Sequence, residues 1–211
     1  YDDICAPSYL QRCVEVLETH GNDVVLAYPK TILIDPAGEP LQRYEDRMNL
    51  HDARPSVRLR RILRDLMLCH CALGLIRTAA LARTDRIRAY MGSDKVMVAQ
   101  LGMIGKFYEV DEYLYYRRVH PESSFKVNAT PREYVKWMDT SKHPWISLPY
   151  TKLFYELFRA VLCSSLSVGE KARCLVQVLL WNPAIAPMKQ ALGTVLPTSL
   201  VTGLKHRLKS R

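Results

Sequence analysis

The sequence contains no uninterrupted run of 18 or more apolar residues, and its longest apolar stretch, residues 175–181, already includes Gln177. A helix that crosses a bilayer needs about 20 predominantly apolar residues, so we expect no transmembrane span. Polar low-complexity tracts and internal repeats are also missing, while apolar residues recur along the whole chain. These absences exclude a mainly disordered protein and a repeat protein.

Paired cysteine motifs and targeting signals are missing as well. The chain starts at Tyr1 rather than at a methionine and shows no signal-peptide pattern, so we expect a cytoplasmic protein and a piece of a longer one. None of the six cysteines belongs to a Cys-x-x-Cys pair, and Cys69 and Cys71 lack a second ligand pair at zinc-site spacing. Reduced, mostly buried thiols are therefore expected.

The overall composition is that of a globular protein, with 48% hydrophobic and 24% charged residues in a chain of 211. A chain of this length buries roughly 70% of the surface that it exposes when unfolded, so a substantial hydrophobic core is expected without disulfide bonds.

The net charge of +9 is distributed unevenly. Residues 1–52 carry ten acidic and four basic side chains, whereas residues 54–88 carry nine arginines and two aspartates. The arginine-rich segment is either a solvated helix face or a surface that binds an anion, such as a diphosphate, an acidic membrane or nucleic acid. Arginine favours phosphate recognition through its forked donors. No nucleic-acid-binding motif accompanies the charge, so we do not expect a nucleic-acid partner.

Hydrophobic periodicity predicts an α/β segment up to about residue 125, followed by a helical extension. Helices are predicted at residues 7–20, 55–68, 92–104, 131–138, 151–163, 167–181 and 187–209. Strands are predicted at residues 24–28, 31–34, 107–110 and 112–118, with a turn at residues 35–38. In the first helix, the predicted apolar side consists of Leu10, Cys13, Val14 and Leu17.

Three features could carry chemistry, and each has a simpler structural interpretation. Asp2 and Asp3 are adjacent carboxylates that could bind a divalent cation or could cap the following helix. Asp94 opens a predicted helix, where it could act as a general base or could stabilise the helix dipole. His120 follows a predicted strand and is either a surface residue or a ligand.

The order of these features resembles that of the family 2 glycosyltransferases, whose fold is the GT-A type that binds nucleotide sugars. The resemblance covers about residues 1–125. It is strongest in the motifs Tyr-Asp-Asp-Ile-Cys-Ala-Pro at residues 1–7, Gly-Leu-Ile-Arg at residues 74–77, Gly-Ser-Asp at residues 92–94 and Tyr-Arg-Arg-Val-His-Pro-Glu-Ser at residues 116–123.

For the donor side of the site, the resemblance implies a metal and a diphosphate. Asp3 would be a ligand of Mg²⁺ or Mn²⁺, and Asp2 would lie nearer the nucleotide ribose. His120 matches a histidine that joins the metal or the diphosphate, and Arg117 or Arg118 would help to neutralise the leaving group.

For the acceptor side, the resemblance implies a glycine-bearing loop and one base. Gly74 matches the loop that passes close to donor and acceptor. Asp94 falls where the family has its catalytic base, although Ser93 stands where a second acid is common. A sugar would pass from a nucleotide-diphosphate donor to a hydroxyl-bearing acceptor, and single displacement with one base would invert the anomeric carbon.

The sequence departs from the family in one large respect. The donor-binding half of the family precedes the acidic motif, but this chain starts at that motif. We therefore expect residues 1–125 to be the C-terminal part of a GT-A-like domain, with residues 126–211 as a helical extension, and we expect the chain alone to be a weak enzyme.

Two other functions stay open. One is a non-catalytic helical and basic module that grips an acidic partner. The other is a peripheral membrane protein, because the helix at residues 151–163 combines apolar and basic side chains. Such a face more often packs into a core.

Overall fold

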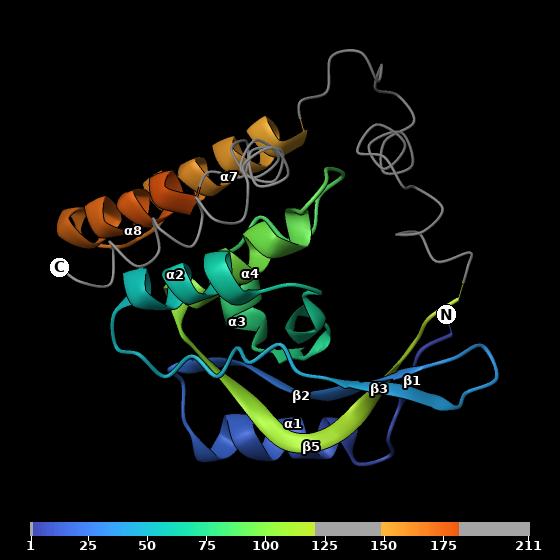
Figure 1. The fold of residues 1–211 in the computed structure, drawn as a ribbon. Helices are drawn as coiled ribbons and strands as arrows, with labels where there is room; N and C mark the ends of the chain where they lie inside the picture. Colours follow the sequence, from blue (N-terminus) through green and yellow to red (C-terminus); the bar gives the residue numbers. More distant parts are fainter. Residues whose placement is uncertain (1, 121–148, 182–211) are drawn as a thin grey trace, which may run out of the picture.

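The computed structural model describes residues 2–120 and 149–181, which form a mixed α/β fold (Figure 1). The strands are β1 (Ile4–Cys5), β2 (Val24–Ile34), β3 (Pro40–Tyr44), β4 (Leu75–Ile76) and β5 (Lys106–Arg118). The helices are α1 (Tyr9–Thr19), α2 (Pro55–Asp65), the 3₁₀ helix η1 (His70–Leu73), α3 (Thr78–Leu81), α4 (Ser93–Ile104), α7 (Pro149–Cys163) and α8 (Val168–Trp181). The predicted α/β class is confirmed, while the predicted helices at residues 131–138 and 187–209 lie outside the described residues.

The sheet is mixed and is organised around the parallel pair β2 and β5. Its strand order is β1-β5-β2-β3, and β4 pairs with β2. Strand β1 runs antiparallel to β5, while β3 and β4 run antiparallel to β2. The long connection from β2 to β5 carries α2, α3 and α4, as expected for a crossover between parallel strands.

The two long strands are each longer than the hydrophobic pattern predicts. β2 is one strand that passes through Pro29 and Lys30, and β5 passes through Asp111. The register between them shifts at these positions. Lys30 Nζ and Asp111 Oδ1 form an ion pair at 2.6 Å across the shift. The polar residues that suggested strand ends therefore mark an irregularity in a continuous pair of strands.

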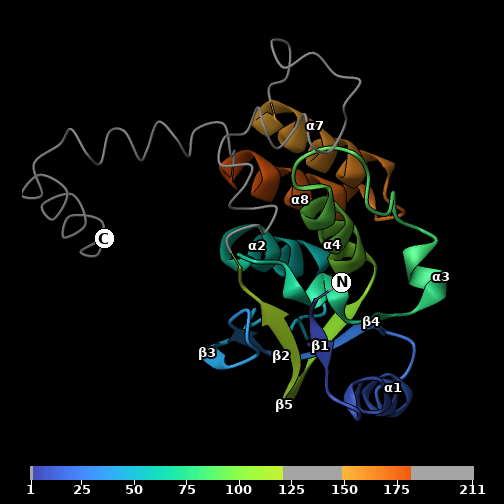
Figure 2. The same ribbon diagram turned by 90° about the vertical axis from the view of Figure 1, so that its right-hand side faces the viewer.

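Helices cover both faces of the sheet, in the layers that Figure 2 shows. Of the described helices, α1 covers one face, where Cys13 and Leu17 pack against β2 and β5. Helices α2 and α4 cover the other face, and α7 and α8 pack on them in the same hydrophobic cluster. The helical extension thus shares a core with the segment that carries the sheet.

The predicted apolar side of the first helix is wrong in two of its four residues. Leu10 is 61% exposed and Val14 is 39% exposed, whereas Tyr9, Cys13 and Leu17 are buried. The helix is rotated so that Tyr9 faces the sheet, where its hydroxyl donates a hydrogen bond to Leu73 O at 2.6 Å. A side chain that is both apolar and hydrogen-bonded takes the inward position.

The apolar side of α7 is part of the core. Leu153, Leu157 and Val161 are buried against the other helices, although Leu162 is exposed. This packing favours the core interpretation of the helix over a membrane-binding one. Within the described ranges, no helix has both the length and the apolar character that crossing a membrane requires.

The sequence Ser-Val-Gly-Glu at residues 167–170 has the spacing of a capping box, and the structure forms half of that pair. The backbone amide of Glu170 lies 3.4 Å from Ser167 Oγ, which is the ordinary half of the motif. The Glu170 carboxylate instead accepts a hydrogen bond from the backbone amide of Ser56 at 2.8 Å. Since Ser56 lies in the first turn of α2, Glu170 joins the starts of two helices.

Candidate functional site

Strand β1 brings the acidic pair beside the basic end of β5. Ile4 pairs with Tyr116 and Cys5 with Tyr115 in an antiparallel register. Asp2 and Asp3 precede β1, so the same register carries them toward Arg117 and Arg118. Figure 1 shows the N-terminus beside the end of β5. Antiparallel pairing, rather than a shared edge of parallel strands, is the reason that these segments meet.

Asp3 is held at this place by two hydrogen bonds from β5. Its Oδ1 accepts a hydrogen bond from the backbone amide of Arg118 at 2.8 Å, and its Oδ2 accepts one from the Tyr115 hydroxyl. Burial and the neighbouring Asp3 carboxylate raise the pKa of Tyr115 above its usual range, so the tyrosine remains a donor. The Asp3 side chain is therefore fixed in orientation while the residue stays exposed.

The Arg118 side chain is used almost entirely within the protein. Its Nε donates to Asp2 O at 3.0 Å, and its Nη1 donates to Asp35 O at 2.9 Å and to Pro36 O at 2.8 Å. These contacts join the N-terminal segment to the turn between β2 and β3. Arg118 is thus a positioning residue for the acidic pair rather than a free anion-binding group.

His120 contacts Asp2 rather than Asp3. The two side chains form an ion pair, with His120 Nε2 2.8 Å from Asp2 Oδ2. About half of the Asp2 side chain is exposed to solvent, so this contact lies at the surface. Asp2, Asp3, Arg118 and His120 are therefore linked by direct contacts at this edge, with Asp2 as the partner of the histidine.

A histidine that the sequence analysis did not select lies under this cluster. Arg117 Nη1 donates to His70 Nε2 at 2.6 Å, and His70 Nδ1 lies 3.1 Å from Thr31 Oγ1. The Tyr44 ring packs edge-on against the imidazole, with the ring centroids 4.7 Å apart. Burial, and then the charge of Arg117, lower the pKa of His70 to about 4. A neutral His70 can therefore accept the hydrogen bond that orients Arg117.

The side chains of Asp2, Asp3 and His120 at this edge of the sheet belong to residue types that bind divalent cations. Carboxylate oxygens are ordinary ligands of Mg²⁺ and Mn²⁺, whereas an imidazole is more typical of softer metals, and each Asp3 oxygen keeps a lone pair beside its hydrogen bond. In the part of the chain that the structure describes, however, no group of three or more His, Cys, Asp or Glu side chains is arranged to hold a metal. The structure thus supplies the donor types but no coordination geometry.

Gly74 is close to the backbone of β2, and this contact accounts for the glycine. A Cβ atom at this position would lie 2.5 Å from Ala27 O and 2.6 Å from Tyr28 Cβ. No larger residue fits without displacing the strand. The glycine allows η1 and β4 to pack on β2, and the sugar-binding role expected from the resemblance is not needed to explain it.

Asp94 lies in the first turn of α4, as the sequence predicts. Its Oδ1 accepts a hydrogen bond from the backbone amide of Lys95 at 2.7 Å. An acidic side chain in the first turn is what the simpler interpretation, stabilisation of the helix dipole, expects. The residue is only half-buried, so its carboxylate also reaches solvent. None of the contacts within residues 2–120 and 149–181 joins Asp94 to Asp3 or His120.

Several arginines of residues 54–88 bind carbonyl oxygens of the protein itself. Arg77 donates to Val24 O, Leu17 O and Gly21 O, and Arg61 donates to Asn49 O and Arg47 O. Arg64 and Arg88 pair with Asp65 and Asp85. The excess of arginine is therefore largely structural, which weakens the interpretation of this segment as one continuous anion-binding surface.

All six cysteines are free thiols, of which Cys5 and Cys163 are exposed. The expectation of reduced and mostly buried cysteines is confirmed. Comparison with protein-family models and with curated proteins gives no match for this sequence. What the protein does is therefore inferred from the residues and contacts described above.

Proposed function

We propose that this chain is the C-terminal part of a GT-A-type glycosyltransferase that transfers a sugar from a nucleotide-diphosphate donor to a hydroxyl acceptor, with inversion. One observation carries the proposal. Asp2, Asp3 and Arg118, which the resemblance assigns to the nucleotide, the metal and the diphosphate, are joined by hydrogen bonds, although more than 110 positions separate Asp3 from Arg118.

The hydrogen bonds of Arg117 and Arg118 suggest a different role for each arginine. Arg118 gives its side chain to carbonyl oxygens and so holds the acidic pair in place. Among the described residues Arg117 uses only Nη1, on His70, which leaves its Nη2 and Nε donors for a ligand. A guanidinium held by one neutral acceptor keeps its full charge. Arg117 is therefore the better candidate to contact the donor diphosphate.

Asp3 and His120 would hold Mg²⁺ or Mn²⁺, and Asp2 would lie nearer the nucleotide. When bound, the cation would neutralise negative charge that develops on the leaving diphosphate. Asp94 would accept the proton of the acceptor hydroxyl, a role that its half-exposed carboxylate permits. A single base on one face of the sugar leads to inversion.

The alternative, a non-catalytic module for an acidic partner, has less support. It requires arginines that are free to bind, whereas Arg61, Arg64, Arg77 and Arg88 already have partners within the protein. Such a module would bind neither a metal nor a nucleotide sugar, and this difference can be measured.

The first experiment measures binding of ADP, GDP, UDP and TDP to the 211-residue chain by calorimetry, with and without Mn²⁺. We expect weak binding of at least one nucleotide that depends on Mn²⁺, because the donor-binding half is not part of this chain. Asp3→Asn should abolish the Mn²⁺ dependence. Glu18→Gln is the matched control, since Glu18 is exposed on α1 and lines neither the Asp3 site nor the cleft described below. No Mn²⁺-dependent binding by any nucleotide would reject the proposal.

The second experiment concerns Asp94 and measures sugar transfer to a hydroxyl acceptor. Asp94→Asn removes the proton acceptor but leaves an oxygen for the Lys95 amide. If Asp94 is the base, turnover falls by about 10²–10⁴-fold with donor binding unchanged. If Asp94 only stabilises the helix start, turnover stays near normal, because Asn is a good residue at that position.

A further inference from the structure

A cleft lies at the opposite end of the sheet from Asp3. It has a volume of about 830 Å³ and is lined by α4, α7 and the loops around them. Asp23 and Lys106, which flank the beginnings of β2 and β5, form part of its wall. β5 has 13 residues, so at about 3.3 Å per residue its two ends are roughly 40 Å apart. The cleft is therefore separate from the site proposed above.

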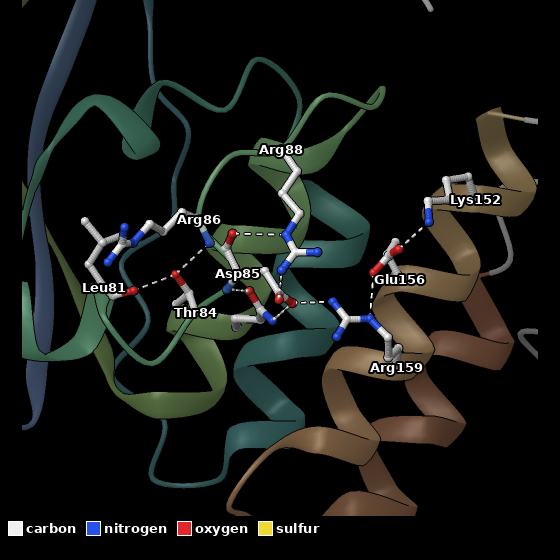
Figure 3. A network of polar contacts seen from close by, with 9 residues as sticks. Leu81, Thr84, Asp85, Arg86, Arg88, Lys152, Glu156 and Arg159 are labelled. Atoms are coloured by element: carbon white, nitrogen blue, oxygen red, sulfur yellow. Dashed lines mark hydrogen bonds and ion pairs between the residues drawn. The ribbon is translucent and has the colours of Figure 1, made fainter. Parts of the chain in front are cut away.

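One wall of the cleft is a network in which every carboxylate has a cation. Asp85 accepts hydrogen bonds from Arg159 at 2.5 Å, from Arg88 at 2.8 Å and from Gln100 at 2.7 Å (Figure 3). Asp23, the other carboxylate of the lining, pairs with Lys106 at 2.7 Å. The acidic side chains of the cleft are thus already neutralised.

Two arginines of the lining have no carboxylate partner in the described part of the chain. Arg83 donates only to the Ser165 hydroxyl, at 3.1 Å. Arg58 is 4% exposed and donates to three carbonyl oxygens, with Nε on Gly102 and Nη1 on Asp52 and Ala53. Its Nη2 has no hydrogen-bond partner among these residues.

The Arg58 guanidinium is a candidate ligand-binding group. Within the described residues Nη2 has no hydrogen-bond partner, and Arg58 lines the cleft. Burial lowers the pKa of Arg58, and nearby Asp52, Glu170 and Asp23 oppose this only through space. A buried charge without a counter-ion is costly, and an anion in the cleft would supply one.

The two arginines and the apolar lining of the cleft indicate which class of ligand it would bind. Two unpaired guanidinium groups match the charge of about −1.5 to −2 that a phosphate monoester carries near pH 7. Met103, Ile104 and Leu166 add an apolar wall. The cleft volume lies in the range of roughly 300–1,000 Å³ that small-molecule sites occupy. We propose that this cleft binds a small organic phosphate through Arg58 and Arg83.

An exposed thiol in the cleft gives a direct test. Cys163 lines the cleft, while Cys5 lies on β1, so Cys5 serves as an internal control in the same molecule. The rate of iodoacetamide alkylation at each cysteine is followed by peptide mass spectrometry in the presence of EDTA. EDTA removes any metal-dependent binding at the Asp3 site, so the result is independent of the function proposed above.

We expect inorganic phosphate to slow alkylation of Cys163 saturably and to leave Cys5 unchanged. Acetate carries one charge in a planar group. At matched ionic strength, it should protect Cys163 from alkylation at least tenfold less well than phosphate does. Equal protection by acetate would reject a phosphate site, and no saturable protection by phosphate would reject an anion site altogether.

Two matched variants locate the effect. Arg83→Gln should raise the phosphate concentration for half-protection about tenfold, since a hydrogen bond to a charged group contributes roughly that much. Arg86→Gln removes the same charge three residues away, outside the lining of the cleft, and should leave protection unchanged. Equal weakening in both variants would mean general charge attraction and would overturn the proposal. Arg58 is not changed, because its carbonyl contacts support the fold.

Discussion

The backbone amide of Arg118 donates a hydrogen bond to Oδ1 of Asp3, 115 positions earlier in the chain, at 2.8 Å. Because β1 has only two residues, this contact and the Tyr115 hydroxyl on Oδ2 carry much of its attachment to β5. The same side chain that would hold a metal thus also fixes the N-terminal segment. If Asp3 holds a metal as proposed, stability and metal binding would be coupled at this residue.

Asp3→Ala should lower the free energy of unfolding by about 1–2 kcal/mol, because two hydrogen bonds to a carboxylate are lost at a partly exposed site. Asp3→Asn retains an acceptor for the Arg118 amide and should lose less. Urea denaturation of the two variants and of Asp2→Ala, whose carboxylate contacts only His120 at the surface, separates these contributions. Equal stability of Asp3→Ala and the parent protein would show that β1 is held by other contacts.

Gly74→Ala should destabilise the protein by about 2 kcal/mol or more. The added Cβ would meet Ala27 O and Tyr28 Cβ at 2.5 and 2.6 Å, both part of a central strand that cannot move cheaply. Gly169→Ala is the matched control, because nothing lies within 4 Å of its Cβ position in α8. That change should be neutral or should stabilise by about 0.5 kcal/mol through helix propensity. Thermal unfolding of both variants measures the difference.

Local patterns in the sequence predict most of the helices and strands. The helix predicted at residues 92–104 matches α4, since Gly92 has a φ of 80° before it and Gly105 follows it. β3 was missed, because Leu41, Gln42 and Arg43 are all exposed on an edge strand and show no apolar alternation. Its position is set by pairing with β2, and a one-dimensional pattern does not contain that information.

The candidate site is predictable in part. Two short motifs at the start of the chain and around residue 117 indicate which residues meet. The sequence does not show that Asp2, rather than Asp3, contacts His120, because this depends on the register of β1. It also gives no sign of His70, whose role comes from Arg117, 47 positions away in the chain. Long-range contacts of this kind arise from topology and not from local composition.

Glu170→Ala should lower the free energy of unfolding by about 1–3 kcal/mol. The change leaves the buried amide of Ser56 without its acceptor and separates the starts of α2 and α8. Glu18→Ala removes a carboxylate of the same kind from an exposed position on α1 and should change stability by less than about 0.5 kcal/mol. Hydrogen exchange at the Ser56 amide provides a second, local measurement. An unchanged exchange rate in Glu170→Ala would contradict the assignment.

The last prediction concerns the pH dependence of stability through His70. In the folded protein, burial and Arg117 lower its pKa to about 4, against an ordinary value of 6.5. Above pH 6.5 the imidazole is neutral in both states, so its contribution to stability is complete. Between pH 6.5 and 4 the unfolded chain takes up the proton first, and stability falls as the pH falls, by about 3 kcal/mol in total.

Chemical denaturation at pH 7, 5.5 and 4 measures this loss of stability. Protonation of carboxylates also changes stability over this pH range, so the parent protein is compared with a variant that lacks the imidazole. In His70→Gln the titrating group is absent, so the decrease from pH 7 to pH 4 should be smaller than in the parent protein by about 3 kcal/mol, even though the variant is less stable at pH 7. His51→Gln removes an exposed imidazole and should keep the parent slope. If His70→Gln loses stability as steeply as the parent protein between pH 7 and 4, His70 is not buried as a neutral imidazole, and its hydrogen bond from Arg117 has to be reassigned.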